Sequence, residues 1–528
     1  MDDEAVIIRT ARGAGALSAQ SIITSLMGTA FFMMMARILS KAEMGIYNAV
    51  FLISTILSVA SLLGMDFATM RYISYYNGKN DPLNKALTYR IVFTVAGLSA
   101  CVVAGTLAAI SVPLSEFLFG TREYAFYILI AAILVLTNAI SLLLLNVLFG
   151  LQKYYHAAAY RVVAQGIRIT ISVMLLLWGL GILAVLMGWM AFYLVLIFAS
   201  LPIFIDDFLG LKRHIQNVSS DPEVSVGKIL HFSLPIVSYQ VIVMLTSSLD
   251  QFILLKLANA QALGSYTVAV TAASIVSIIM VTPIVSTLLP GFSETMGRIG
   301  EEQVISSLKL ATRYINLVFI PSCIGIAILS PPLVILLGGS KYLDAALPLT
   351  IISLGAITCG TSAAIAAAFL ATGRTSDVFV AYITGSGIEM VSTMIFVPIW
   401  GTTGAALGRA LMFTTIFAIL MVLCLKRLRG AIDTRTSMKS LIASAVMTPA
   451  VYVIAVMTGY QLMMLPLYLL VGVCSYALPL LLMRTIEFSD IEFFCKVVPM
   501  GRIFLAIFEK YYYGNSAVSR ILRKFIPR

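Results

Sequence analysis

Long apolar segments follow one another along nearly the whole chain, separated by short polar stretches. Of the 528 residues, 60% are hydrophobic and only 11% are charged, whereas a soluble domain averages about 25% charged residues. A helix needs roughly 20 apolar residues to cross a bilayer, and only helices and closed barrels satisfy their backbone groups in lipid. The pattern therefore predicts an all-α polytopic membrane protein with about fourteen transmembrane helices.

The predicted spans fall at residues 13–38, 44–66, 88–111, 125–149, 157–178, 182–205, 229–255, 263–289, 306–330, 345–372, 378–398, 402–425, 441–457 and 463–483. Loops after even-numbered spans carry most of the loop Lys and Arg residues. The positive-inside rule then predicts that both termini and these loops are cytoplasmic, in a multi-pass protein of the cell membrane.

The turn between the first two spans recurs later in the chain, with residues 36–47 resembling residues 255–266. The matched pairs are Gly45 with Gly264, Tyr47 with Tyr266, and Arg37 with Lys256, each 219 positions apart. Arg90 and Arg313 form a similar pair, 223 positions apart. Because six spans per repeat is an even number, both halves have the same orientation. This predicts two lobes related by a pseudo-twofold axis along the membrane normal, with a cavity between them.

The repeat predicts five segments. They are an N-lobe at 1–205, a cytoplasmic linker at 206–228, a C-lobe at 229–428, an appended helix pair at 429–483, and a basic amphipathic cytoplasmic tail at 484–528. Aromatic and basic residues fall partly at helical spacing in the tail, which is typical of a helix lying on an anionic leaflet.

Four ionisable side chains lie deep within predicted spans: Arg168, Asp250, Glu389 and Arg409. Such groups are costly in a bilayer and usually face a cavity or a partner. Arg168 and Glu389 hold matched positions in spans five and eleven, so they can pair across the cavity. A buried ion pair that binds no ligand is the alternative for all four, and Lys256 can serve as the partner of Asp250.

Cations also stand at predicted helix ends, where membrane anchoring is the alternative to ligand binding. They are Arg37, Arg71, Arg90, Arg161, Lys256 and Arg313. A cationic cavity suits an anionic substrate, because Arg pairs bidentately with phosphate. The predicted substrate-binding residues are Arg37, Arg168, Lys256, Arg409, Arg90 and Arg313. Asp250 and Glu389 are candidates for carrying a coupling proton or sodium ion, or for holding the arginines in place.

No constellation of catalytic residues is evident. The three histidines are isolated, the six cysteines lack zinc or disulfide spacing, and no phosphate-binding Gly-rich loop contains a Lys. We therefore expect no enzyme, metal, cofactor or nucleic-acid partner. Energy would come from a proton or sodium gradient, from the substrate gradient or from removal of product.

Several short motifs resemble the polysaccharide transporter (oligosaccharide flippase, Wzx-like) family of the multidrug/oligosaccharidyl-lipid/polysaccharide (MOP) exporter superfamily. They are Ala36-Arg37-Ile38-Leu39, Gly45-Ile46-Tyr47, Arg71-Tyr72, Gly150-Leu151-Gln152-Lys153, Phe232-Ser233-Leu234-Pro235, Asp250 and Gly264-Ser265-Tyr266. Each motif is weak, but their order and spacing are fairly specific, and the resemblance runs from Arg12 to Met483.

The resemblance implies two six-helix lobes, as in MATE transporters, plus a helix pair and a central cationic cavity. It also implies flipping of polyprenyl-(di)phosphate-linked oligosaccharide from the cytoplasmic to the outer leaflet by alternating access, for polysaccharide or glycoprotein glycan biosynthesis. In this family, cavity arginines are thought to contact the phosphates, a role carried here to Arg37, Arg168 and Arg409. The partners implied are the anionic lipid-linked oligosaccharide, membrane lipids and membrane glycosyltransferases. The alternatives are a sodium- or proton-coupled drug or metabolite exporter, a peptidoglycan-precursor flippase of the same fold, and a membrane glycan polymerase or ligase.

Overall fold

A computed structural model describes residues 3–215, 223–276, 282–428, 432–483 and 485, and within these ranges it contains helices and turns but no strand. Twelve of the described helices are long and apolar enough to cross a membrane, or thirteen when one bent pair is counted as a single span. The prediction of an all-α multi-pass membrane protein is confirmed.

The helices follow one another in the order α1 (Asp3–Ile38), α2 (Lys41–Ser61), α3 (Met65–Gly78), α4 (Pro82–Ala109), α5 (Ser111–Phe119), α6 (Ala125–Gly150), α7 (Tyr154–Leu177), α8 (Ile182–Ile215), α9 (Val226–Thr246), α10 (Leu249–Leu257), α11 (Ala260–Val276), α12 (Thr282–Arg298), α13 (Glu301–Ile328), α14 (Ser330–Gly338), the 3-10 helix η2 (Ser340–Ala345), α15 (Ala346–Ala356), α16 (Cys359–Ala371), α17 (Thr375–Trp400), α18 (Thr402–Arg427), α19 (Thr434–Met457), the 3-10 helix η3 (Leu462–Met464) and α20 (Leu465–Leu482). Each predicted span overlaps one to three of these helices.

Some predicted spans are interrupted within the described residues. The second ends early, because Leu63 and Gly64 adopt positive φ between α2 and α3. A Cβ atom at Gly64 would lie 2.4 Å from the carbonyl oxygen of Ser233, so this turn packs directly against backbone. The seventh span is broken between α9 and α10, and the tenth is the pair α15 and α16, bent by 40°.

The contacts divide the chain into two compact units. Unit 1 contains residues 1–268, 337–342 and 390–405, and unit 2 contains the rest. This division does not follow the predicted lobe boundary at 206–228, because α9, α10 and most of α11 pack with the first half of the chain. The two six-helix lobes therefore stay a prediction. The predicted tail lies outside the described residues except for Thr485.

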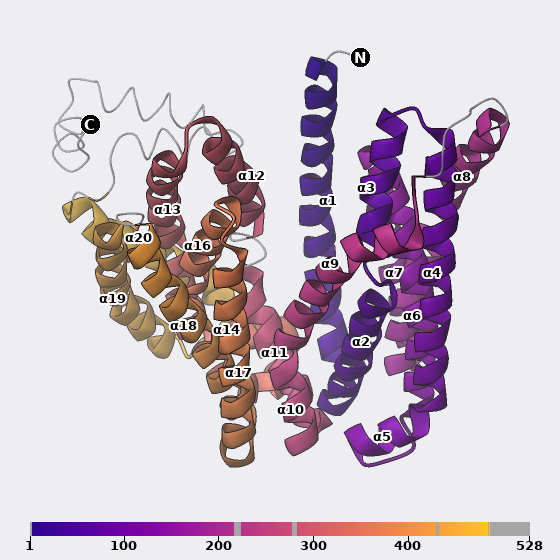
Figure 1. Cartoon of the computed structure of the whole chain (residues 1–528). Helices are drawn as coiled ribbons and strands as arrows, with labels where there is room; N and C mark the ends of the chain where they lie inside the picture. The colour runs from indigo at the N-terminus through magenta and orange to yellow at the C-terminus, as the bar shows by residue number, and fades with distance from the viewer. Residues whose placement is uncertain (1–2, 216–222, 277–281, 429–431, 484, 486–528) are drawn as a thin grey trace. The chain divides into compact units, whose positions relative to one another are not determined.

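Unit 1 is centred on a group of long helices. Figure 1 shows α4, α6, α7 and α8 side by side, with α6 and α7 both packed against α8 and with α1 packed along α7. Small residues allow such close packing in a membrane protein, as where Gly188 of α8 lies against Ser172 of α7. This group positions the buried Arg168.

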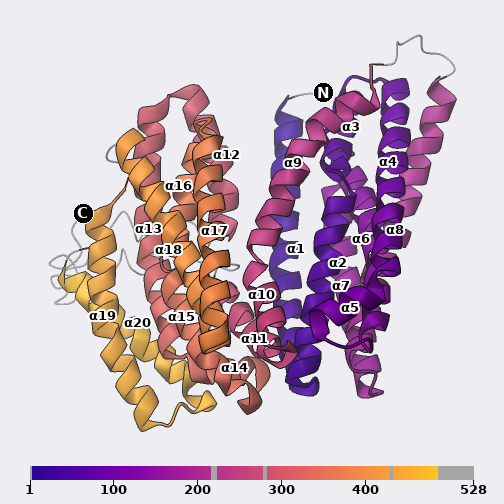
Figure 2. The ribbon, with the colours of Figure 1, turned by 60° about the horizontal axis from the view of Figure 1, so that its bottom comes forward.

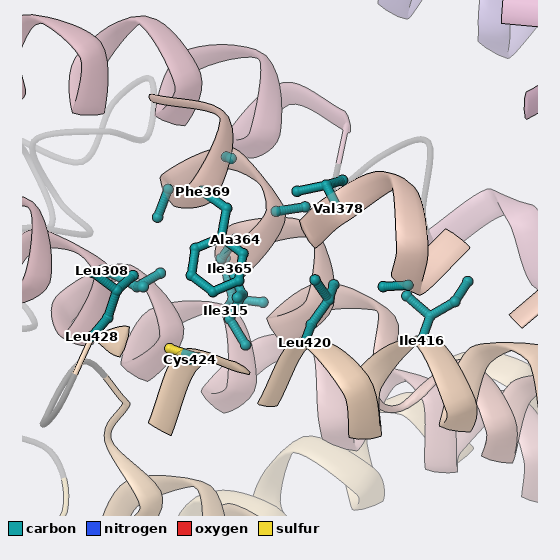
Figure 3. Packing of buried hydrophobic residues seen from close by; sticks show 14 of the residues in the cluster. Leu308, Ile315, Ala364, Ile365, Phe369, Val378, Ile416, Leu420, Cys424 and Leu428 are labelled. Atoms are coloured by element: carbon teal, nitrogen blue, oxygen red, sulfur yellow. The ribbon is translucent and has the colours of Figure 1, made fainter. Parts of the chain in front are cut away.

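Unit 2 has its apolar core where α13, α16, α17 and α18 meet. Figure 3 shows Ile315 of α13, Phe369 of α16 and Leu420 of α18 pointing into one cluster. Helices α19 and α20 lie side by side (Figure 2), and hydrogen bonds join both of them to α13. The amide of Asn316 donates to Ser437 at 2.8 Å, and the Tyr476 hydroxyl donates to the carbonyl of Leu317 at 2.7 Å.

Candidate functional site

Arg168 is a buried cation surrounded by aromatic rings. It lies on α7 with 5% of its surface exposed. Its guanidinium carbon is 4.0 Å from the ring centre of Trp189 and 5.1 Å from that of Phe31. Within the described part of the chain, Arg168 makes no hydrogen bond and no ion pair, and its Nε is fully buried. Cation–π contacts contribute on the order of 0.5–2 kcal/mol each, so the rings offset only part of the cost of burying this charge.

The spacing of residues on α7 explains how Arg168 comes to lie there. Arg161, Gln165, Arg168 and Ser172 are four, three and four residues apart, so they form one stripe along the helix. On the facing helix α8, a Cβ atom at Gly188 would lie 1.8 Å from the Ser172 hydroxyl. Glycine therefore allows α8 to approach α7 closely, and the next residue, Trp189, reaches the guanidinium.

Two residues of this stripe, Arg161 and Gln165, line an open pocket of about 340 Å³ between α1, α6, α7 and α8, here called the amide pocket. Its lining residues are Gln20, Thr24, Ser25, Asn138, Ser141, Leu142, Leu145, Arg161, Gln165, Trp189, Phe192, Tyr193 and Leu196. Asn138 and Gln165 are 7% and 6% exposed. Neither side-chain amide bonds to another described residue, whereas the Gln20 amide donates to Thr24 at 3.1 Å.

The second buried arginine has an acidic partner. In unit 2, the Arg409 Nε is 3.8 Å from a carboxylate oxygen of Glu389, which is completely buried. The two residues come from α18 and α17. Glu389, considered above as a partner for Arg168, thus has its ion-pair partner within its own unit. Arg168 and Arg409 stand in different electrostatic settings.

The repeated turns meet each other in unit 1, where we call their contact the hairpin seam. A Cβ atom at Gly45 would lie 1.8 Å from the carbonyl oxygen of Ala260, and one at Gly264 would lie 1.8 Å from that of Lys41. The start of α2 and the start of α11 therefore touch through their backbones. Nearby, the Asn48 amide donates to the side-chain oxygen of Gln251 at 2.6 Å.

Two predicted residues lie beside this seam. Asp250 is fully buried at the start of α10 and accepts hydrogen bonds from the Gln251 N–H and the Tyr266 hydroxyl. Lys256 was considered as its partner, but its Nζ donates to the carbonyl of Phe117 on α5 at 2.5 Å and lies over the Phe117 ring.

The remaining predicted cations lie elsewhere. Arg37 is exposed at the end of α1, and its carbonyl accepts a hydrogen bond from Lys341. Arg90 is exposed on α4. Arg313 donates to the carbonyl of Thr485 at 3.2 Å, beyond the end of α20. No bound molecule tests these assignments, and they stay predictions.

Sequence reasoning overlooked the amides and aromatic residues of the amide pocket. Asn138, Gln165, Trp189 and Tyr193 were not considered, and Arg161 was treated as a membrane anchor or a further cavity cation. One signal was available, because Gln165 stands on the helical stripe between Arg161 and Arg168. The residues that α6 contributes to the pocket, such as Asn138, come close to α7 only through tertiary packing, so the spacing of residues in the sequence does not reveal them.

Comparison with protein families gives a match over residues 34–347 to the family described as polysaccharide biosynthesis protein. A comparison with curated proteins finds no match. The family match covers more than half of the chain.

Solved structures with the same fold are membrane transporters. The structure of the lipid II flippase MurJ in an inward closed conformation aligns with 89% of this chain and 98% of its own, with a TM-score of 0.71 and 15% identity. An inward-facing multidrug resistance MATE family transporter of the MOP superfamily covers 77% of this chain and 95% of its own, with a TM-score of 0.61 and 16% identity. A MOP superfamily transporter from Pyrococcus furiosus covers 80% and 96%, with a TM-score of 0.53 and 16% identity.

Proposed function

Because the chain belongs to the polysaccharide biosynthesis protein family and has the fold of MOP superfamily transporters, we propose that it is a flippase for lipid-linked oligosaccharides. Its substrate would be a glycan on a polyprenyl phosphate or diphosphate, moved from the cytoplasmic to the outer leaflet of the cell membrane. The N- and C-termini would face the cytoplasm, as the loop charges predict.

The buried guanidinium of Arg168 carries this proposal. An arginine within a membrane-spanning helix costs at least about 2.5–3.5 kcal/mol, and a protein bears that cost where the charge has a use. An incoming phosphate would supply the anion that the described surroundings of Arg168 lack. Arginine offers a planar fork of donors that matches phosphate oxygens, and such charge-assisted bonds are strong in a low-dielectric site.

Energy for the movement would come from an ion gradient or from removal of the product. Asp250 and Glu389 are the buried carboxylates available to bind a proton or sodium ion. Membrane glycosyltransferases would supply the substrate on the cytoplasmic side. These roles extend the proposal and depend on it.

The test follows the transfer of a fluorescent polyprenyl-diphosphate oligosaccharide between leaflets of proteoliposomes, with and without proton and sodium gradients. We expect Arg168→Gln to abolish transfer and Arg168→Lys to retain only part of it, because Lys keeps the charge but loses the fork. The matched control is Arg122→Gln, which removes an exposed arginine paired with Glu116. Full transfer by Arg168→Gln would overturn the assignment of this residue.

A cation exporter is the second candidate, since MATE transporters share the fold and aromatic rings surround Arg168. Gradient-driven efflux of a cationic dye, without transfer of the lipid-linked glycan, would favour it. We prefer the flippase, because a buried arginine repels a cationic substrate.

A further inference from the structure

A proline interrupts the hydrogen-bond ladder of α13. Pro321 has no N–H group, so the carbonyl of Leu317, four residues earlier, loses its usual donor within the helix. Helix α13 is long and apolar enough to cross a membrane. A freed carbonyl has no water to bond in the membrane interior, and leaving it unpaired is costly. The Leu317 carbonyl therefore needs a donor from a neighbouring helix.

Helix α20 supplies that donor. The Tyr476 hydroxyl donates to the carbonyl of Leu317 at 2.7 Å. Ser440 of α19 reaches the same place, since its hydroxyl oxygen lies 2.8 Å from that of Tyr476 and 3.0 Å from the carbonyl oxygen of Asn316. Two consecutive carbonyls of α13 are thus contacted by hydroxyl groups from α19 and α20, at the turn that the proline weakens.

The side chain of Asn316 extends this contact to a further helix. Its oxygen accepts a hydrogen bond from the Thr361 hydroxyl of α16 at 2.7 Å, and its nitrogen donates to the Ser437 hydroxyl of α19 at 2.8 Å. Asn316 is 3% exposed. Polar side chains of this kind join helices within a membrane. The turn that precedes the proline is therefore bonded to α16, α19 and α20.

Prolines inside other helices lack such a donor. Pro202 in α8, Pro235 in α9 and Pro398 in α17 also remove the N–H partner of the carbonyl four residues earlier. Among the residues that the structure describes, no side chain donates to any of those three carbonyls. The Leu317 carbonyl differs from them because another helix bonds to it.

The repeat offers a second comparison. Arg90 of α4 and Arg313 of α13 hold matched positions 223 residues apart, and the same offset matches Leu98 to Pro321. Helix α4 has no proline after Pro82 at its start, and Leu98 is 65% exposed. Of these two matched helices, the proline occurs in the one whose freed carbonyl has a donor on a neighbouring helix.

We propose that α19 and α20 form a brace that fixes α13 at Pro321, so that this proline makes a permanent interruption in the helix and does not act as a hinge. Tyr476 is the central residue of the brace, because its hydroxyl replaces the backbone donor that Pro321 lacks. The inference concerns the fold of unit 2 and does not depend on the identity of the substrate.

Hydrogen exchange followed by mass spectrometry tests the brace in the full-length protein in lipid nanodiscs. We expect Tyr476→Phe, which removes only the hydroxyl group, to speed exchange of the α13 amides on either side of Pro321 about five- to tenfold, as expected for the loss of a hydrogen bond. The control is Tyr468→Phe on the same helix, whose hydroxyl bonds to Thr458. This control should leave exchange in α13 unchanged.

Pro321→Ala identifies the group that Tyr476 supports. Alanine restores an N–H group at position 321, which can donate to the Leu317 carbonyl in place of the tyrosine. Adding Tyr476→Phe to Pro321→Ala should therefore change exchange in α13 by less than about twofold, because the two changes act on the same carbonyl.

Each of the other outcomes would overturn the proposal. An equal rise in exchange with and without Pro321→Ala would mean that Tyr476 supports α13 by packing and not through the freed carbonyl. Exchange around Pro321 that Tyr476→Phe does not change would mean that the hydroxyl fixes nothing. If Tyr476→Phe alone fails to fold, Pro321→Ala should restore folding, and a double variant that also fails to fold would contradict the brace.

Discussion

At the scale of single residues, Arg168 is a buried charge that we expect to oppose stability. Its charge is buried against Trp189 and Phe31. We predict that Arg168→Met stabilises the protein by about 1–3 kcal/mol, because it removes a charge from the low-dielectric interior and loses only cation–π contacts. Thermal unfolding in detergent measures this, alongside Arg122→Met as an exposed control. A lower melting temperature for Arg168→Met would show that the guanidinium is structural.

Arg409 should respond in the opposite way. Removing it leaves the carboxylate of Glu389 buried without that cation, and breaking a buried pair costs about 3–5 kcal/mol. We therefore predict that Arg409→Met lowers the melting temperature and that adding Glu389→Leu restores much of it. Arg298→Met is the control, since its partner Glu294 and the arginine itself are exposed. Additive losses in the double variant would contradict a coupled pair.

At the scale of elements, the hairpin seam depends on two glycines. A side chain at Gly45 would displace the backbone at Ala260, and one at Gly264 would displace that at Lys41. We predict that either Gly→Ala change destabilises the protein by about 1–3 kcal/mol, the range for overpacking. The double change should cost less than the sum, because both act on one contact. The control Gly97→Ala adds a Cβ atom with no neighbour within 4 Å, so a loss there as large as at Gly45 would contradict the argument.

Helix α19 begins at a carboxylate whose titration can be followed. Burial tends to raise the pKa of Asp433, but hydrogen bonds from Thr436 and the nearby charge of Arg313 outweigh it and hold the pKa below its usual value. The folded protein therefore binds this proton less readily than the unfolded chain does. The stabilisation is present above the usual carboxyl pKa, near 4, and is lost as the pH falls through the lowered value.

Asp433→Asn tests this cap. The difference in melting temperature between the parent and the variant should be constant from neutral pH to about pH 5 and shrink below about pH 4. A difference independent of pH would show that the charge of Asp433 has no role. The result also bears on Arg313, which the sequence suggested as a substrate-binding residue and which the structure places near this cap.

At the scale of the whole molecule, the features that could be predicted from the sequence are those that follow a regular pattern in it. The spans were found because long apolar runs have few interpretations, and Arg168 and Glu389 were found because a charge within such a run is conspicuous. The breaks before Gly64 and after Thr246 were not found, since an apolar run looks the same whether or not its helix is interrupted. Asn138 and Gln165 were missed because an amide becomes informative only when packing leaves it without a partner.

The structure adds a further matched pair to the predicted repeat. Gly120 and Gly339 are 219 positions apart, and both adopt positive φ at the end of a short helix. Each half of the repeat forms a hydrogen bond with the hairpin of the other half. Lys256, in the second hairpin, donates to the carbonyl of Phe117 on α5. In the reverse direction, Lys341 of η2 donates to the carbonyls of Arg37 and Leu39 at 3.1 and 2.5 Å.

These reciprocal contacts predict how the seam opens. If substrate leaves by separating the two hairpins on their predicted extracellular side, the two lysines hold the closed state. Hydrogen bonds from charged donors contribute about 1.5–3 kcal/mol each, and 1.4 kcal/mol is a tenfold change in an equilibrium constant.

We expect Lys256→Met and Lys341→Met each to increase the open population about tenfold, and the double variant to exceed both. A single cysteine replacing Ala49, which is buried at the seam against Leu255 and Leu263, in a chain without its native cysteines, reports opening by its reaction with an impermeant maleimide added outside. Lys79→Met, which breaks an exposed pair with Glu223, should leave that rate unchanged. An unchanged rate in the double lysine variant would contradict this role of the two lysines and would leave the backbone packing at Gly45 and Gly264 and the Asn48–Gln251 hydrogen bond to keep the seam closed.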